Sequence, residues 1–123
     1  MSKRILLVGH CGIDGPRLQR EIASQLEDAE GVRINSMDDL RQACERGADL
    51  LLVNREPVGF MPQMGLDLIR ELRDQFPGQK VMLVSDYPEA QEEAAAAGAL
   101  PGFGKEDLGS RKFEDAILRA LEA

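Results

Sequence analysis

The sequence feature that most constrains the fold is an uninterrupted apolar run, Leu-Leu-Leu-Val at residues 50–53, inside the segment 48–54. The run is too short for an ordinary helix, and it lacks the alternation of apolar and polar residues that marks a half-exposed strand. It is typical of a strand that is buried on both faces of a parallel sheet. Asn54 follows it directly and opens a loop that reaches Met64. Ligands of open parallel sheets bind where strands end in such loops, so we expect function to depend on Asn54 and its neighbours.

Four further strands and five helices are expected around this segment. Apolar segments predict strands at 3–8, 32–35, 80–84 and 99–103. Apolar residues three to four apart predict helices that begin near 14, 36, 66, 89 and 110. Gly31 is expected to break the first helix, and Ser36 and Ser110 are suited to cap the second and the last. The regular alternation of strand and helix predicts an α/β fold, a parallel sheet with helices on both faces.

Composition limits the class of protein. The chain has 123 residues, of which 43% are hydrophobic, so we expect a single domain over 1–123. Its 22 acidic and 15 basic residues give a net charge of −7, which argues against direct nucleic-acid binding. No apolar stretch approaches the roughly 18 residues of a membrane span or the core of a signal peptide, so we expect a cytoplasmic protein without membrane association. Two separated cysteines and one histidine argue against a structural zinc site.

Several short segments follow one another in an order and spacing that is specific as a set. They are 4–8, 48–53, Met61-Pro62 before 65–72, 81–85, 97–99 and 102–105. Together they resemble the receiver domain of two-component response regulators, over essentially the whole chain. The resemblance implies a flavodoxin-like, doubly wound sheet with strand order 2-1-3-4-5 and a role in two-component phosphorelay signalling.

The phosphoryl chemistry of that family needs four kinds of group. These are a carboxylate acceptor after strand three, an acidic pair after strand one to hold Mg²⁺, a Ser or Thr after strand four and a Lys after strand five. The resemblance places Asn54 at the acceptor position and Gly9 and His10 at the acidic pair. Ser85 and Lys105 match the last two positions.

These substitutions remove the central chemistry. An Asn amide is a poor nucleophile, and neither Gly9 nor a neutral His10 suits Mg²⁺, which prefers oxygen ligands. The loop after Asn54 is also longer than the family's usual loop. We therefore expect a pseudo-receiver that is not phosphorylated by the usual mechanism, binds Mg²⁺ weakly or not at all, and has no enzymatic activity.

One alternative keeps phosphorylation. In it, Glu56 or Asp86 replaces Asn54 as the acceptor, and Asp14, Glu56 and Asp86 rebuild a cation site. Asp14 and Asp86 are also suited to plain helix caps. Lys105 either holds a phosphate together with Ser85 or forms a surface ion pair with Glu56 or Asp86.

A second alternative assigns a sensor role to the loop 9–15. Its glycines could cradle an anionic ligand, or the thiol beside His10 could respond to oxidants. The competing interpretation is that these are turn glycines, with a buried Cys11 and with His10 facing solvent.

Partners are expected to be other signalling proteins. The resemblance implies that they bind the face made by helix four, strand five and helix five, and a homodimer through this face is also expected. The three glutamates of the helix at 89–97 could serve as an acidic docking surface, although the competing interpretation is a solvated helix face.

Overall fold

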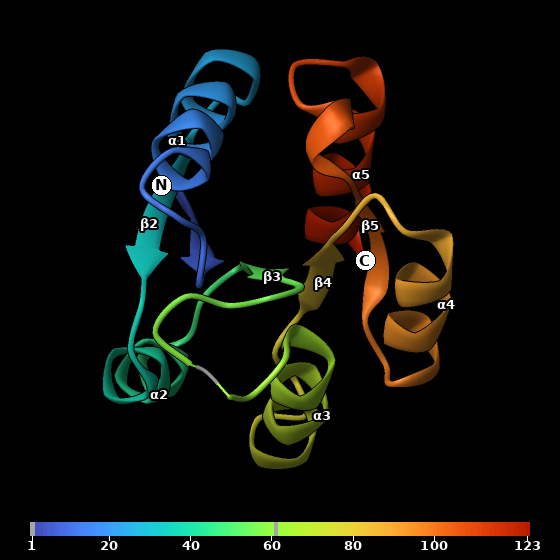
Figure 1. Ribbon diagram of the computed structural model, residues 1–123. Coiled ribbons are helices and arrows are strands. Elements are labelled where there is room, and N and C mark those ends of the chain that lie inside the picture. Colours follow the sequence, from blue (N-terminus) through green and yellow to red (C-terminus); the bar gives the residue numbers. More distant parts are fainter. Residues whose placement is uncertain (1, 61) are drawn as a thin grey trace.

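Five strands alternate with five helices along the chain (Figure 1). The strands are β1 (Lys3–Val8), β2 (Ala29–Ile34), β3 (Leu50–Asn54), β4 (Val81–Val84) and β5 (Leu100–Phe103). The helices are α1 (Asp14–Gln25), α2 (Met37–Arg46), α3 (Gly65–Gln75), α4 (Pro88–Ala96) and α5 (Arg111–Glu122), and a short 3₁₀ turn, η1 (Lys105–Asp107), precedes α5. This computed structural model describes residues 2–60 and 62–123; Met61, part of one segment behind the family resemblance, lies outside the described residues.

The sheet is parallel throughout and has the order β2-β1-β3-β4-β5, which confirms the predicted fold class and strand order. Every residue of β3 is buried, as the apolar run predicted. Leu51 and Val53 point to a core shared with α2, α3 and α4, whereas Leu50 and Leu52 point to a core shared with α1 and α5. Figure 1 shows α1 and α5 together on one side of the sheet. No helix in the described ranges is long and apolar enough to cross a membrane.

The prediction for Gly31 was wrong. The chain turns earlier, at Asp28, whose φ of 55° is the left-handed conformation that Asp tolerates. Gly31 lies inside β2, opposite Ile5 of β1. A Cβ at Gly31 would lie 3.1 Å from a methyl carbon of Leu7 and 3.3 Å from one of Ile22, so glycine allows α1 to pack closely on the sheet. β2 starts at Ala29, three residues before the predicted start at Val32, and the other predicted boundaries fall within two residues of those observed.

Serine hydroxyls cap two of the helices, as predicted. The Ser36 hydroxyl accepts a hydrogen bond from the backbone N–H of Asp39 at 3.2 Å. The Ser110 hydroxyl accepts one from the N–H of Phe113 at 3.4 Å. Both bonds satisfy a donor in the first turn that has no partner within the helix.

Helix α4 is held by one amide side chain more than by apolar packing. It buries only Ala90 and Ala94. The Nε2 of Gln91 donates to the carbonyl oxygens of Leu83 at 2.9 Å and Ser85 at 3.1 Å, at the end of β4. Gln91 therefore ties α4 to the strand whose end borders the candidate site.

We expect Gln91→Ala to lower the free energy of unfolding by about 1–2 kcal/mol, because the strand carbonyls lose their donor in a half-buried position. Urea unfolding monitored by circular dichroism measures the change. Glu92→Ala, on the exposed face of the same helix, is the matched control and should change stability by less than about 0.5 kcal/mol. Equal effects of the two substitutions would show that Gln91 does not anchor α4.

Candidate functional site

The loops that follow β1, β3, β4 and β5 meet at one edge of the sheet and enclose a cleft of about 330 Å³. Most of the residues singled out in the sequence line it. They are Asn54, Glu56, Ser85, Asp86, Lys105 and Cys11. Gly9, His10 and Asp14 lie beside the cleft and do not line it. The fold therefore brings most of the predicted site residues together at one cleft. The chemistry of this cleft depends on the hydrogen bonds and ion pairs that each side chain forms.

Asn54 uses its amide hydrogens to join two loops. The side chain is 7% exposed, and its Nδ2 donates to the carbonyl oxygen of Gly9 at 3.0 Å and to that of Glu56 at 3.1 Å. An ionised carboxylate has no hydrogen to donate and would face both carbonyl oxygens. The surroundings of residue 54 therefore suit an amide, at the position where the resemblance implied the phosphoacceptor.

The loop after Asn54 closes over the end of β1. Gly9 has a φ of +73°, and the backbone N–H of Val58 donates to its carbonyl oxygen at 2.8 Å. A Cβ placed on Gly9 would collide with Cα and Cβ of Pro57. No side chain fits at Gly9 while Pro57 is in place. In the sequence, the long loop after Asn54 and the glycine at position 9 looked like two unrelated differences from the family pattern. In the structure they belong together, because the loop occupies the space beside Gly9.

His10 is fully buried. Its Nε2 lies 2.9 Å from the carbonyl oxygen of Leu52, which can only accept, so this nitrogen carries the hydrogen. Burial lowers the pKa of His10 from its ordinary value of 6.5 to about 4, so the ring is neutral near pH 7.

The interpretation with His10 in solvent and Cys11 buried was therefore wrong. Cys11 is partly exposed and lines the cleft, where its sulfur accepts a hydrogen bond from the N–H of Asp14 at 3.3 Å. The chain turns at Gly9 and carries the imidazole inward, where Leu52, at the carboxyl end of the sheet, provides an acceptor. The other thiol, Cys44, is buried, and burial raises its pKa to about 11.

Lys105 is already paired. Its Nζ lies 2.7 Å from a carboxylate oxygen of Asp14, and this bond lowers the pKa of Asp14. The expected ion pair of Lys105 with Glu56 or Asp86 does not form. Asp14 lies in the first turn of α1 and bonds across the site, so it does not cap that helix, whose N-cap is Ile13.

The remaining acids are directed elsewhere. Glu56 pairs with Arg55 at 3.0 Å. A carboxylate oxygen of Asp86 accepts from the N–H of Glu106 at 3.2 Å, and the N-cap of α4 is Tyr87, so the cap predicted for Asp86 was wrong. Within residues 2–60 and 62–123, no three His, Cys, Asp or Glu side chains gather so that they could hold a metal ion.

Ser85 is buried, and its side chain is hydrogen-bonded to the backbone of the following turn. Its hydroxyl accepts a hydrogen bond from the N–H of Tyr87 at 3.1 Å, which shapes the turn into α4. The position implied for a phosphoryl-binding hydroxyl thus has a structural partner of its own.

Comparison with known proteins identifies the fold. Neither a protein-family model nor a curated protein matches this chain. A response regulator from Thermotoga maritima is similar in structure, with a TM-score of 0.77 and 18% identity over 100% of both chains. The N-terminal signal receiver domain of a two-component response regulator from Bacteroides fragilis gives a TM-score of 0.81 and 17% identity over 98% of each chain.

The match to NtrX from Brucella abortus has a TM-score of 0.77 and 24% identity, over 99% of this chain and 28% of that one. The fold is that of response-regulator receiver domains. At sequence identities of 17–24%, structural similarity establishes the arrangement of strands and helices and nothing about function. The chemistry of this receiver fold has to be argued from its own side chains.

His10 predicts a pH dependence of stability. The pKa is 6.5 in the unfolded chain and about 4 in the folded one, so below pH 6.5 the unfolded state binds the proton and the folded state does not. The contribution of the neutral His10 side chain to the free energy of unfolding is therefore complete above pH 6.5 and is lost as the pH falls toward 4. Lowering the pH from 7.5 to 5 should cost about 2 kcal/mol of unfolding free energy, measured by urea unfolding.

His10→Gln is the matched variant, because its amide can still donate to Leu52 but does not titrate. Since His10 is the only histidine, this variant should be nearly flat between pH 7.5 and 5. An unchanged slope would assign the pH dependence to other groups.

Asn54→Asp should lower the unfolding free energy at pH 7 by about 2 kcal/mol, because the carbonyl oxygens of Gly9 and Glu56 lose their donor and face a buried charge. The deficit should shrink as the pH approaches 4 and the introduced carboxyl group becomes protonated. Thermal unfolding of the parent protein and of Asn54→Asp between pH 7 and pH 4 measures this difference in stability. A variant as stable as the parent at pH 7 would contradict the amide requirement.

Proposed function

We propose that this protein is a receiver-type domain of two-component signal transduction that acts through protein contacts and is not switched by aspartyl phosphate. The observation that carries the proposal is the packing of Pro57 on Gly9, which fills the space where the family's acidic pair would begin. Together with the amide at Asn54, this leaves no carboxylate at the end of β3 and no acidic pair at the end of β1, the two positions from which the family binds Mg²⁺ and accepts the phosphoryl group.

The charge arrangement supports the same conclusion. A phosphoryl group gains from a free cation, but Lys105 is neutralised by Asp14 at 2.7 Å. Glu56 and Asp86 add negative charge to the lining of the cleft, and one of the two carboxylates is balanced by Arg55. An incoming phosphoryl anion would have to break an ion pair that spans the loops after β1 and β5.

The face made by α4, β5 and α5 supports a role in binding. A cavity of about 580 Å³ lies there, with Leu100 and Pro101 of the edge strand at its base. Arg111, Lys112 and Arg119 of α5 line it together with Asp115, whereas α4, on the other side of the edge strand β5, exposes glutamates. A basic element beside an acidic one on the same surface suits an isologous contact between two copies as well as a signalling partner.

The deciding experiment is an amide NMR spectrum with and without Mg²⁺ and beryllofluoride, a mimic of the aspartyl phosphoryl group. We expect no change in the parent protein. We also expect none in Asn54→Asp, because Gly9 still provides no metal ligand. Shifts at Asn54, Ser85, Asp86 and Lys105 in the parent protein would overturn the proposal.

The alternative in which Glu56 or Asp86 accepts the phosphoryl group has a separate test. Incubation with a small phosphodonor and Mg²⁺ should leave the intact mass unchanged. A gain of one phosphoryl group that disappears in Glu56→Gln or in Asp86→Asn would establish that alternative.

A further inference from the structure

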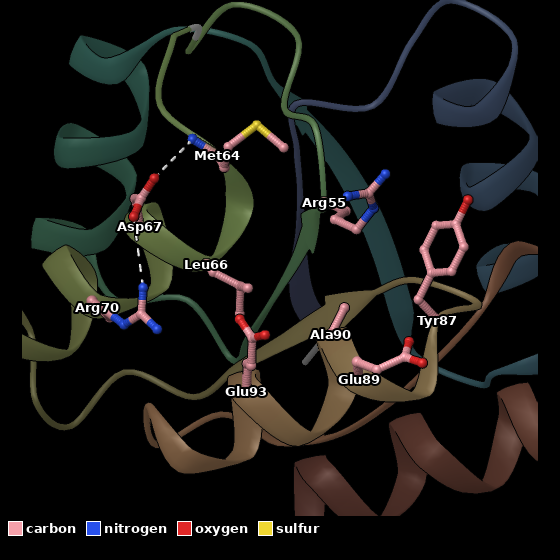
Figure 2. Close-up of a pocket in the computed structure, with 9 residues that line it drawn as sticks. All are labelled: Arg55, Met64, Leu66, Asp67, Arg70, Tyr87, Glu89, Ala90 and Glu93. Atoms are coloured by element: carbon pink, nitrogen blue, oxygen red, sulfur yellow. Dashed lines mark hydrogen bonds and ion pairs between the residues drawn. The ribbon is translucent and has the colours of Figure 1, made fainter.

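A third concave surface lies between the N-terminal turns of α3 and α4, on the side of α4 that faces α3. It is a groove of about 500 Å³, within the size range of sites that hold a side-chain cluster or a small ligand. In Figure 2, Glu89 and Glu93 lie along α4, Asp67 and Arg70 lie along α3, and Arg55 and Tyr87 stand at one end. The apolar part of the lining comes from Met64, Leu66, Ala90 and the Tyr87 ring.

The charges around this groove do not cancel. Arg70 pairs with Asp67 at 3.6 Å, and Arg55 pairs with Glu56 at 3.0 Å. Among the described residues, neither Glu89 nor Glu93 has an ion-pair partner. The groove therefore presents two uncompensated carboxylates, one helical turn apart, above an apolar floor.

The aromatic end of the groove already binds a cation from its own chain. The guanidinium of Arg55 lies 4.8 Å from the centroid of the Tyr87 ring, within the range of a cation–π contact. Tyr87 is 58% exposed and is one of few large apolar side chains on the surface. An exposed aromatic ring next to unpaired carboxylates is suited to a partner that brings both positive charge and apolar surface.

We propose that this groove binds a basic amphipathic segment of a partner protein. Two cationic side chains of the segment, one helical turn apart, pair with Glu89 and Glu93, and an apolar side chain between them packs on Leu66, Ala90 and Tyr87. Helix-in-groove recognition reads anchors at this spacing. The chain's net charge of −7 also favours the approach of a basic partner. This site does not depend on the proposed loss of phosphorylation or on the α4, β5 and α5 face.

The test uses the full chain and a synthetic peptide of about 14 residues, long enough to form a helix on binding, with Lys and Leu placed on opposite faces. Fluorescence anisotropy at about 150 mM salt, where long-range attraction is screened, measures the affinity, and amide NMR locates the peptide. We expect shifts in the N-terminal turns of α3 and α4. A peptide with Glu in place of every Lys should not bind.

Paired variants separate the groove from total charge. Glu89→Gln combined with Glu93→Gln should weaken binding about fivefold, as expected for the loss of two exposed ion pairs. Glu45→Gln combined with Glu92→Gln removes the same charge from exposed positions outside the groove and should change affinity by less than about twofold. All four side chains are exposed, so both double variants should fold, and their NMR spectra verify this.

Three outcomes would overturn the proposal. They are equal weakening by the two double variants, shifts located on β5 and α5 in place of α3 and α4, and no binding of the basic peptide. Each of them would leave the proposed function untouched, because the receiver fold rests on the strand order and the similar structures, and the loss of phosphorylation rests on the cleft around Asn54.

Discussion

The contact on which the candidate site depends is the closure of the loop after β3 over the end of β1. Pro57 packs on Gly9, Val58 donates to the Gly9 carbonyl, and the Asn54 amide bonds to the same oxygen. Because one carbonyl accepts from both the strand end and the loop, the two move as a unit. A carboxylate at Asn54 or any side chain at Gly9 would open this arrangement.

The electrostatics of the cleft follow from that closure. His10 is carried beneath the loop, where burial keeps it neutral, and Asn54 is neutral by nature. Two pairs of charges balance each other, Lys105 with Asp14 and Arg55 with Glu56, whereas the Asp86 carboxylate in the lining has no ion-pair partner among the described residues. Because Lys105 is already paired with Asp14, we expect a phosphoryl anion to gain little from binding in this cleft. Such a domain can still carry a signal if a partner binds one of its conformations better than another.

Helix α4 separates the two surfaces to which binding is assigned. Its apolar anchorage is small, so the Gln91 side chain has to hold it to the end of β4. Its exposed positions are correspondingly free to carry charge, and Glu89 and Glu93 face the groove shared with α3. Weak packing and strong charge on one helix are two consequences of the same alanine-rich and glutamate-rich sequence.

The class of fold and the place of the site could be predicted from local patterns in the chain. Periodicity and continuous apolar runs are local properties, and burial in a sheet is their direct physical consequence, so the strands, the helices and the position of Asn54 were predictable. The sequence also shows that an amide and not a carboxylate follows β3, because this depends only on the residue type at position 54.

The bonding partners of those residues could not be predicted, because they depend on contacts between segments that are distant in the chain. The sequence suggested Glu56 or Asp86 as the ion-pair partner of Lys105, and the arrangement of the loops brings Asp14 to it instead. The inward direction of His10 and the role of Gly31 depend on contacts with Leu52 and Ile22, which are remote in sequence. Pro57 and Gly9 carry no pattern that links them, since steric exclusion between distant backbone segments leaves no local periodicity.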